Sequence, residues 1–145
     1  MSLKKIVYKT LLNLRKPGVV LYGHNATQNK NDQILPSLHL YPNELERSIN
    51  SFLELGIEFI SMDTLIKISK NKFKHDKPWV HFSFDDGYKE NLQTVLPLFE
   101  KYNLPFTVFI SSNHIANHER FYSFRARLAV MNAKTDIEIL GEKIA

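Results

Sequence analysis

The stretch Trp79-Val-His-Phe-Ser-Phe-Asp-Asp-Gly87 decides how the rest of the chain is interpreted. Its first part, Trp79–Phe84, has the length and the aromatic composition of a β-strand. This strand runs directly into two adjacent carboxylates and a glycine, which permits a sharp turn. Reactive groups of α/β proteins gather at the carboxyl ends of strands. The stretch therefore predicts an α/β fold with a site at the end of this strand.

Strand-like and helix-like segments alternate on both sides of this stretch. Pro42 is typical of a first helical residue, Gly56 of a left-handed helix end, and Pro97 predicts a kink or break inside its helix. The remaining segments, Gly23–Leu40 and Asn71–Lys77, are expected to be loops, and the tail after Lys134 is left unassigned. The expected strands are Val19–Tyr22, Ile57–Ile60, Trp79–Phe84 and Phe106–Ile110; the expected helices are Leu3–Leu14, Pro42–Leu55, Met62–Lys70, the segment marked by Leu92, Val95, Leu96 and Phe99, and Phe121–Met131.

Strands separated by helices imply parallel pairing through right-handed crossovers. Four such strands would make a small parallel α/β sheet or half of a (β/α) barrel. No internal repeat, linker or low-complexity segment interrupts the pattern. We therefore expect a single domain that spans residues 1–145.

Composition excludes several classes of protein. The chain has 145 residues, of which 43% are hydrophobic and 23% charged, as in ordinary globular domains. It has no cysteine, which excludes disulfides, thiolate metal sites and a cysteine nucleophile. The net charge of +4 is scattered, apart from a modest cluster at 67–77, and no nucleic-acid motif accompanies it. We expect a solvated basic face and no nucleic-acid partner.

The N-terminal segment resembles an amphipathic helix more than a signal peptide. Lys9 and Asn13 interrupt its apolar residues, and no small-residue cleavage site follows. No stretch approaches the roughly 20 apolar residues of a membrane span. We therefore expect no membrane span and a cytoplasmic location.

The carboxylate pair has two interpretations. Adjacent side chains of an extended segment point in different directions, so one aspartate can hold a divalent metal while the other faces the substrate. A metal would lower the pKa of a bound water, and the free carboxylate would take its proton. In the alternative interpretation, Asp-Asp-Gly is turn chemistry, and Asp85 or Asp86 caps the following helix.

Several separated segments together resemble the polysaccharide deacetylase family, the NodB-homology group. The family's first motif reads Thr-Phe-Asp-Asp-Gly, and here Ser83 replaces the threonine. A leucine-proline pair inside the next helix and a Leu-Pro-x-Thr before the next strand are also typical of the family. The likeness covers roughly residues 19 to 131 and rests on Leu21–His24, Tyr41–Leu45, Phe59–Leu65, Val80–Asn91, Leu96–Phe99 and Lys101–Ile110.

This resemblance implies an irregular (β/α) barrel and a hydrolase that removes N-acetyl groups from a carbohydrate. Carried over to this chain, Asp85 would be the general base and Asp86 the ligand of a divalent metal, which is often zinc in the family. The family completes its metal site with a later His-Ser/Thr-x-x-x-His motif, and a further histidine acts as general acid. Neither motif occurs in these 145 residues, so the chain resembles the N-terminal part of the domain.

Three histidines are alternative ligands. His114 and His118 are four residues apart, a spacing that would place both on one face of a helix, although surface loop positions are the better explanation for them. His24 closes the first expected strand and either reaches the site or is a hydrogen-bonded structural histidine.

Two other functions remain open. The chain could be a truncated or inactive deacetylase-like domain that binds glycan or a protein partner without catalysis. A half-barrel would expose strand edges and apolar surface, and would then form a homo-oligomer, bind another chain or be poorly stable. The chain could also be an unrelated α/β binding module in which Asp-Asp-Gly is only a turn.

Overall fold

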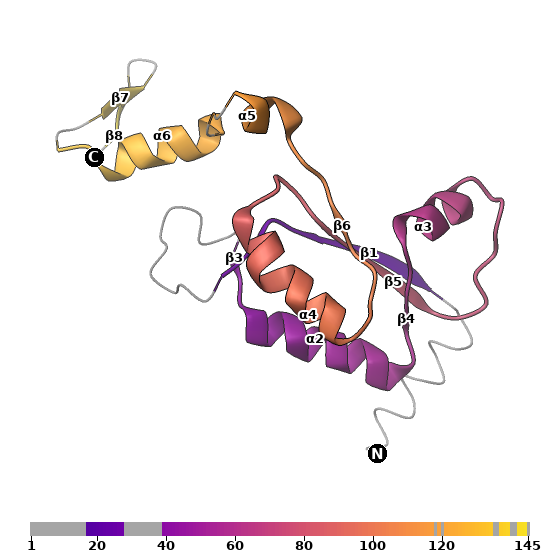
Figure 1. Ribbon diagram of the computed structural model, residues 1–145. Coiled ribbons are helices and arrows are strands. Elements are labelled where there is room, and N and C mark those ends of the chain that lie inside the picture. Colours follow the sequence, from indigo (N-terminus) through magenta and orange to yellow (C-terminus); the bar gives the residue numbers. More distant parts are fainter. Residues whose placement is uncertain are drawn as a thin grey trace. The chain divides into compact units, whose positions relative to one another are not determined.

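The computed structural model describes residues 17–27, 39–117, 119, 121–134, 137–139 and 142–144. The chain divides into two compact units, residues 1–28 with 38–110 and residues 29–37 with 111–145. The first unit holds the sheet and the carboxylate pair, and the second holds the elements that follow residue 110 (Figure 1). The expectation of one domain over residues 1–145 stays a prediction.

The first unit is built on a parallel sheet, as the sequence predicts. Its strands are β1 (Gly18–Gly23), β4 (Glu58–Phe59), β5 (Trp79–Phe84) and β6 (Thr107–Val108), and all pair in parallel with β5. The central strand β5 pairs with β1 along its whole length. All four expected strands are therefore present, although β4 and β6 are shorter than their apolar runs.

The second edge of β5 is shared by two strands. The N–H of Ile60, just after β4, donates to the carbonyl of Val80 at 2.9 Å, near the start of β5. Four residues further on, the carbonyl of Phe84 accepts a hydrogen bond of 2.8 Å from the N–H of Phe109, just after β6. Alternate carbonyls of a strand point to the same edge, so β4 and β6 both lie on this edge of β5. Strand β4 pairs with the first half of β5, and β6 pairs with the second half.

Helix α2 (Pro42–Leu55) begins and ends where the sequence predicts. Pro42 occupies the start of the helix, and Gly56 adopts the left-handed conformation with a φ of 75°. Leu45 and Ile49 are buried, and they lie four residues apart on one face of the helix. Helix α2 lies beside the later helix α4 in Figure 1, on the same side of the sheet.

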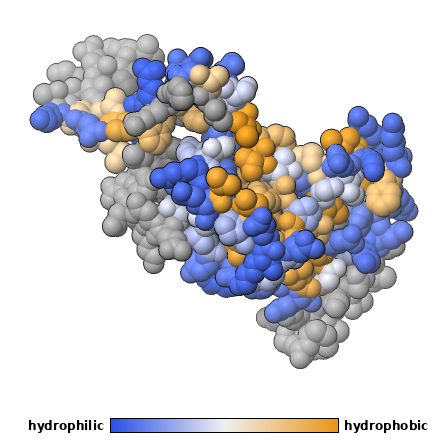
Figure 2. Space-filling model, viewed as in Figure 1, coloured by the Kyte–Doolittle hydropathy of each residue, from blue (hydrophilic) through white to orange (hydrophobic). Residues whose placement is uncertain are grey.

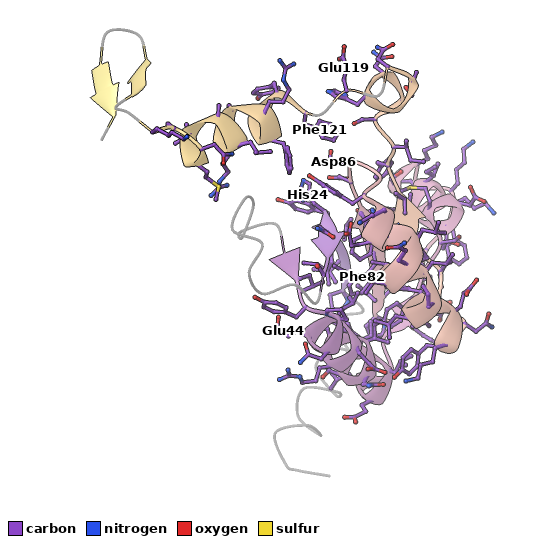
Figure 3. All side chains as sticks on the ribbon, turned by 60° about the vertical axis from the view of Figure 1, so that its left-hand side comes forward. His24, Glu44, Phe82, Asp86, Glu119 and Phe121 are labelled. Carbon is purple, nitrogen blue, oxygen red and sulfur yellow. The ribbon has the colours of Figure 1, made fainter. Side chains whose placement is uncertain are left out.

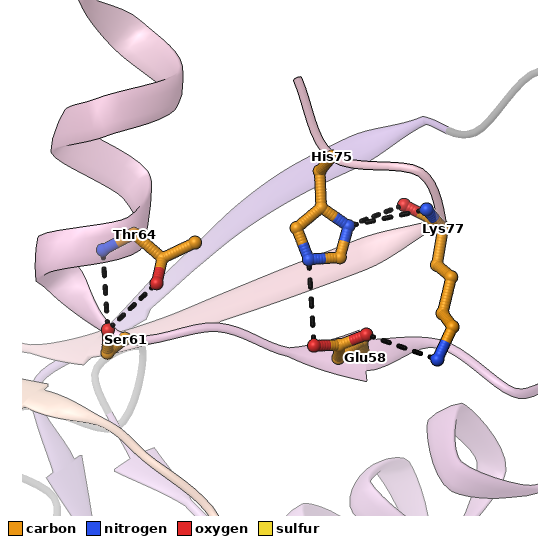
Figure 4. A network of polar contacts seen from close by, with 5 residues as sticks. All are labelled: Glu58, Ser61, Thr64, His75 and Lys77. Carbon is orange, nitrogen blue, oxygen red and sulfur yellow. Dashed lines mark hydrogen bonds and ion pairs between the residues drawn. The ribbon is translucent and has the colours of Figure 1, made fainter. Parts of the chain in front are cut away.

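Helix α3 (Met62–Ser69) is capped by Ser61, whose hydroxyl accepts a hydrogen bond from the N–H of Thr64 at 3.3 Å. The charged loop that follows the helix is joined to β4 (Figure 4). In this network Glu58 pairs with His75 at 3.6 Å and with Lys77 at 3.7 Å. The loop therefore has a defined position next to the start of β5.

Phenylalanine rings form the centre of the core. Phe99 is fully buried, and its ring contacts four other phenylalanines with centroid distances of 4.8 to 6.5 Å. Edge-to-face arrangements of this kind stabilise a core beyond the area that they bury. The rings come from α2, β4, β5, α4 and the segment before β6, and belong to Phe52, Phe59, Phe82, Phe84, Phe99 and Phe106.

The break that Pro97 predicts is a change of helix type. Residues Asn91–Val95 form the π-helical turn η2, which continues into α4 (Leu96–Lys101). Because proline has no N–H, it cannot donate to the carbonyl four residues earlier. The N–H of Leu96 instead bonds the carbonyl of Asn91, five residues back, which is the π-helical pattern.

The π-helical turn also corrects the expected buried face of this helix. Val95 and Phe99 are fully buried, but Leu92 is 68% exposed, and Asn91 takes an inward position instead. A π-turn fits more residues into each turn than an α-helix does, so it carries Leu92 further round the helix, away from Val95. The α-helical spacing of Leu92, Val95, Leu96 and Phe99 could not reveal this shift.

The segment Gly23–Leu40 is not entirely loop, contrary to our expectation. Its two ends form the short parallel strands β2 (Asn25–Ala26) and β3 (His39–Leu40), with Asn25 opposite His39. Two-residue strands are too short to show an alternating pattern, and asparagine and alanine have low β-propensity. Residues 28–38, between the two strands, lie outside the described part of the chain.

In the second unit, α6 (Tyr122–Met131) confirms the predicted helix, while α5 (Ser112–Ala116) was not predicted. The tail forms an antiparallel pair of β7 (Ile137–Ile139) and β8 (Glu142–Ile144). The predicted helix Leu3–Leu14 lies outside the described residues. Within the described ranges, no helix has the length and apolar character needed to cross a membrane.

Candidate active site

Asp85 lies immediately beyond the last paired residue of β5. Its N–H donates a hydrogen bond of 2.8 Å to the carbonyl of Gly23, at the end of β1. Asp86 and Gly87 follow with a φ of 72° each, in the left-handed region. Aspartate and glycine are residues that tolerate this conformation, so the sequence suits the reversal of the chain here. The predicted turn beneath the site is confirmed.

Both carboxylates are partly buried and available. Neither the side-chain carboxylate of Asp85 nor that of Asp86 has a hydrogen bond or ion pair within the described part of the chain. The π-helical turn that follows has Glu90 at its N-cap and no capping side-chain hydrogen bond. The interpretation of this pair as helix caps is therefore not supported. Two neighbouring carboxylates with free oxygens can accept protons or hydrogen bonds, or contribute ligands to a cation.

His24 lies at the same end of the sheet as the carboxylate pair (Figure 3). It follows Gly23, the residue that pairs with Phe84 and accepts the hydrogen bond of Asp85. Its half-buried ring meets the ring of Tyr22 edge to face, with centroids 6.2 Å apart. No hydrogen bond to its ring nitrogens is present in the described region, so the alternative of a hydrogen-bonded structural histidine finds no support.

The described residues do not assemble a complete metal site. Among them, no group of three or more His, Cys, Asp or Glu side chains is arranged to hold a metal ion. His114 belongs to the second unit, where its ring stacks on Phe121 with centroids 4.2 Å apart, and His118 lies outside the described residues. The assignment of Asp86 as a metal ligand, and of His114 and His118 as further ligands of the same metal, stays a prediction.

An apolar pocket of about 250 Å³ adjoins the Asp-Asp-Gly turn. Leu92 and Ile110 on its rim are 68% and 60% exposed, and Figure 2 shows apolar side chains over β6 and beside α4. Asn91 in its wall is buried, yet neither its Oδ1 nor its Nδ2 has a partner. The sequence pattern gave no reason to single out this asparagine. The pocket is lined by Gly87, Tyr88, Asn91, Leu92, Leu96, Phe106, Val108 and Ile110.

Comparisons with known proteins agree with this geometry. Residues 72–139, which include both aspartates, match the family described as polysaccharide deacetylase. The fold is similar to that of IcaB from Ammonifex degensii, with a TM-score of 0.62 and 16% identity over 74% of this chain. It is also similar to that of a de-N-acetylase from Aggregatibacter actinomycetemcomitans, with a TM-score of 0.58 and 20% identity over 88% of this chain. No curated protein sequence matches.

The resemblance seen in the sequence is confirmed, because residues 72–139 match the polysaccharide deacetylase family and the fold is similar to those of the two solved structures. The alignments span only 42% and 44% of the two similar structures. The predicted fold class of parallel strands alternating with helices is likewise confirmed. Closure into a barrel, the roles of Asp85 and Asp86, and the metal are not tested by these comparisons.

Proposed function

We propose that this chain contributes the carboxylate part of the active site of a carbohydrate N-deacetylase. The observation that carries the proposal is the pair Asp85–Asp86, which has free oxygens at the end of the central strand, inside the segment that matches the family. The reaction is the hydrolysis of an N-acetyl group on a sugar. The oxygen of water bonds to the acetyl carbon, the C–N bond breaks, and acetate and the sugar amine are released.

In this proposal Asp85 is the general base. Its carboxylate accepts a proton from the attacking water, and this contribution is typically worth about 10²–10⁴ in rate. The hydrogen bond between its N–H and Gly23 holds the backbone at the strand end, so that the carboxylate has a defined position. Such positioning reduces the entropy lost on reaching the transition state.

Asp86 is proposed to hold a divalent cation, and zinc is the expected metal. Its oxygens fit such a cation, but catalytic zinc sites use three protein ligands. The described residues provide no such group, so this part of the chain alone does not fit a complete metal site. The remaining ligands would have to come from other residues of the domain.

The alternative function is binding of a glycan or a protein partner without catalysis. This function needs no metal, and the described residues hold no group of three or more side chains that could bind one. The two functions differ in one measurable property, because only the enzyme releases acetate.

The test is acetate release from N-acetylated oligosaccharides in the presence of zinc, with the metal content of the protein measured in parallel. Asp85→Asn should lower acetate release about 100-fold or more, because a carboxamide is not a base at neutral pH. Asp86→Asn should lower both the activity and the bound metal. Asp63→Asn, at the exposed start of α3, is the matched control. Equal activity of wild type and Asp85→Asn would rule out the proposed role of Asp85.

A further inference from the structure

We propose that the free edge of β1 pairs in antiparallel fashion with the same edge of a second copy of this chain. The inference concerns assembly and goes beyond the proposed function. Strand β1 pairs with β5 on one side, and no strand in the described part of the chain pairs with its other side. This edge therefore offers backbone hydrogen-bonding groups to an incoming strand.

The hydrogen bonds to β5 show which backbone groups of β1 are unused. The carbonyls of Pro17 and Gly23 accept bonds of 3.1 and 2.8 Å from N–H groups at the two ends of β5. Alternate residues of a strand direct their backbone groups to the same neighbour, so the odd-numbered residues face β5. The free edge consequently carries the N–H and C=O groups of Gly18, Val20 and Tyr22.

This edge lacks the features that usually keep edge strands from associating. Natural edge strands carry charged side chains, a proline or a bulge. Strand β1 reads Gly-Val-Val-Leu-Tyr-Gly, and its register with β5 is continuous over all six residues. Val19 and Val20 are 41% and 48% exposed, and Tyr22 is 75% exposed. The edge is thus regular, uncharged and apolar, which suits pairing with another strand.

The order of residues along β1 identifies a second copy as the partner. About a two-fold axis beside Val20, this residue lies opposite itself, and Tyr22 lies opposite Gly18 of the second copy. All three are hydrogen-bonded positions, so each donor and acceptor of the free edge meets its complement. Because the strand carries no charge, it meets no like-charge repulsion from its own copy.

The pairing of tyrosine with glycine also accounts for the exposed ring. Gly18 is paired with Trp79, and a Cβ added at this glycine would overlap the indole, so the indole covers Gly18. Residues directly opposite each other in an antiparallel pair have Cβ positions about 4.5–5.5 Å apart. The ring of Tyr22 therefore reaches the indole over Gly18 of the second copy, at the spacing of aromatic pairs. The two-fold axis makes this contact twice.

The size of the interface sets the expected affinity. Two six-residue strands are only about 20 Å long, so they bury less than the roughly 1,200 Å² of a standard interface. We therefore expect a reversible dimer with a Kd on the order of 10⁻⁴ M.

The first test is hydrogen exchange of the β1 amides by NMR, on the full chain at about 20 μM and about 1 mM. Exchange at Gly18, Val20 and Tyr22 should slow about fourfold at the higher concentration, as the fraction of monomer falls. The amides of Val19 and Leu21, which face β5, should not respond. Fast exchange of all three edge amides at both concentrations would overturn the inference. Protection that is independent of concentration would do so too, because the same chain would then cover the edge.

The second test uses charge at the two-fold axis. Val20→Lys and Val20→Glu each place like charges opposite one another and should weaken dimerisation about tenfold or more in sedimentation. An equimolar mixture of the two variants should associate at least as tightly as wild type. Val130→Lys makes the same change at a 45% exposed valine of the second unit and should behave as wild type.

Protection of the Leu21 amide in each variant verifies that it is folded. Unchanged association of Val20→Lys, or folded variants whose mixture stays monomeric, would contradict pairing of Val20 with itself. Acetate release is measured separately and does not enter either test, so the proposed function and this inference stand or fall independently.

Discussion

The backbone N–H of Asp85 donates a hydrogen bond of 2.8 Å to the carbonyl oxygen of Gly23. This bond extends the pairing of β1 and β5 by one residue beyond Phe84, where the regular strand ends. It joins residues 23 and 85, which lie far apart in the sequence, at the carboxyl ends of the two strands, where the carboxylates lie. His24 and Asp85 each follow directly after the last residue pair of the two strands, Gly23 and Phe84, so strand register brings them to the same end of the sheet.

Glycine at position 18 is required by the packing of β1 against β5. A Cβ added at Gly18 would overlap the indole ring of Trp79, whereas one added at Gly23 would make only ordinary contact with Phe84. We expect Gly18→Ala to lower the free energy of unfolding by about 1–3 kcal/mol, as overpacking does. Gly23→Ala is the matched control on the same strand and should change it much less. Equal effects in urea denaturation would contradict this account.

The phenylalanine cluster should depend most on Phe99, whose ring contacts those of Phe59, Phe82, Phe84 and Phe106. Phe99→Ala should cost about 3–5 kcal/mol, because a fully buried ring leaves a cavity. Phe99→Leu retains most of the volume and should cost about 1–2 kcal/mol, which keeps the protein folded enough to measure.

The control for this prediction is Phe73→Ala, since Phe73 is 47% exposed in the charged loop. It should change the free energy of unfolding by about 0.5 kcal/mol or less. If Phe73→Ala and Phe99→Leu had similar effects, the ring cluster would not be the centre of the core.

The π-helical turn predicts that two nearby apolar residues, Val95 and Leu92, contribute very differently to the free energy of unfolding. Val95→Ala should cost about 2 kcal/mol, because Val95 is fully buried. Leu92→Ala should cost about 0.5 kcal/mol or less, because Leu92 is 68% exposed. An ordinary α-helix would place both residues on the buried face. Thermal unfolding of the two variants distinguishes these arrangements.

The turn beneath the carboxylates should tolerate few residues at position 87. Gly87 has a φ of 72°, and an added Cβ would meet Ile110 only at ordinary contact distances, so the cost is conformational. Gly87→Ala should destabilise the fold by about 1–2 kcal/mol. Gly87→Asn should cost less, because asparagine visits the left-handed region more readily. The order of the two melting temperatures tests this reasoning.

One contact between α2 and α4 should depend on pH. Glu46 accepts hydrogen bonds from Lys101 at 2.6 Å and from Tyr102 at 2.9 Å. The hydrogen bond from Lys101, followed by that from Tyr102, lowers the pKa of Glu46 below its usual value of 4.5. A lowered folded-state pKa means that the stabilisation is present above the unfolded pKa and is lost as the pH falls through the folded value.

Glu46→Gln should therefore melt slightly below wild type at pH 7, and the difference should shrink as the pH falls below 4.5. Glu100→Gln, on the exposed surface of α4, is the comparison. High salt should reduce the Glu46 effect, because the pair lies near solvent. A difference that grows at acid pH would reverse the assigned sign.

Local signals in the sequence predicted most of the sheet and of the candidate site. The predicted strand Trp79–Phe84 has the same first and last residues as β5. Helix α2 begins at Pro42 and ends before Gly56, as the backbone preferences of these two residues predict. The carboxylates lie at the strand end as the pattern indicates. The short strands β2 and β3 were missed because two residues carry no periodic signal.

By itself, the sequence determined a parallel α/β sheet and a turn that presents Asp85 and Asp86, because apolar periodicity and turn chemistry act between close neighbours in the chain. Only the tertiary structure decided that β4 and β6 share one edge of β5. It also decided that Leu92 faces outward and that Tyr22 is exposed. These features depend on hydrogen bonds and packing between distant residues, which no local pattern records.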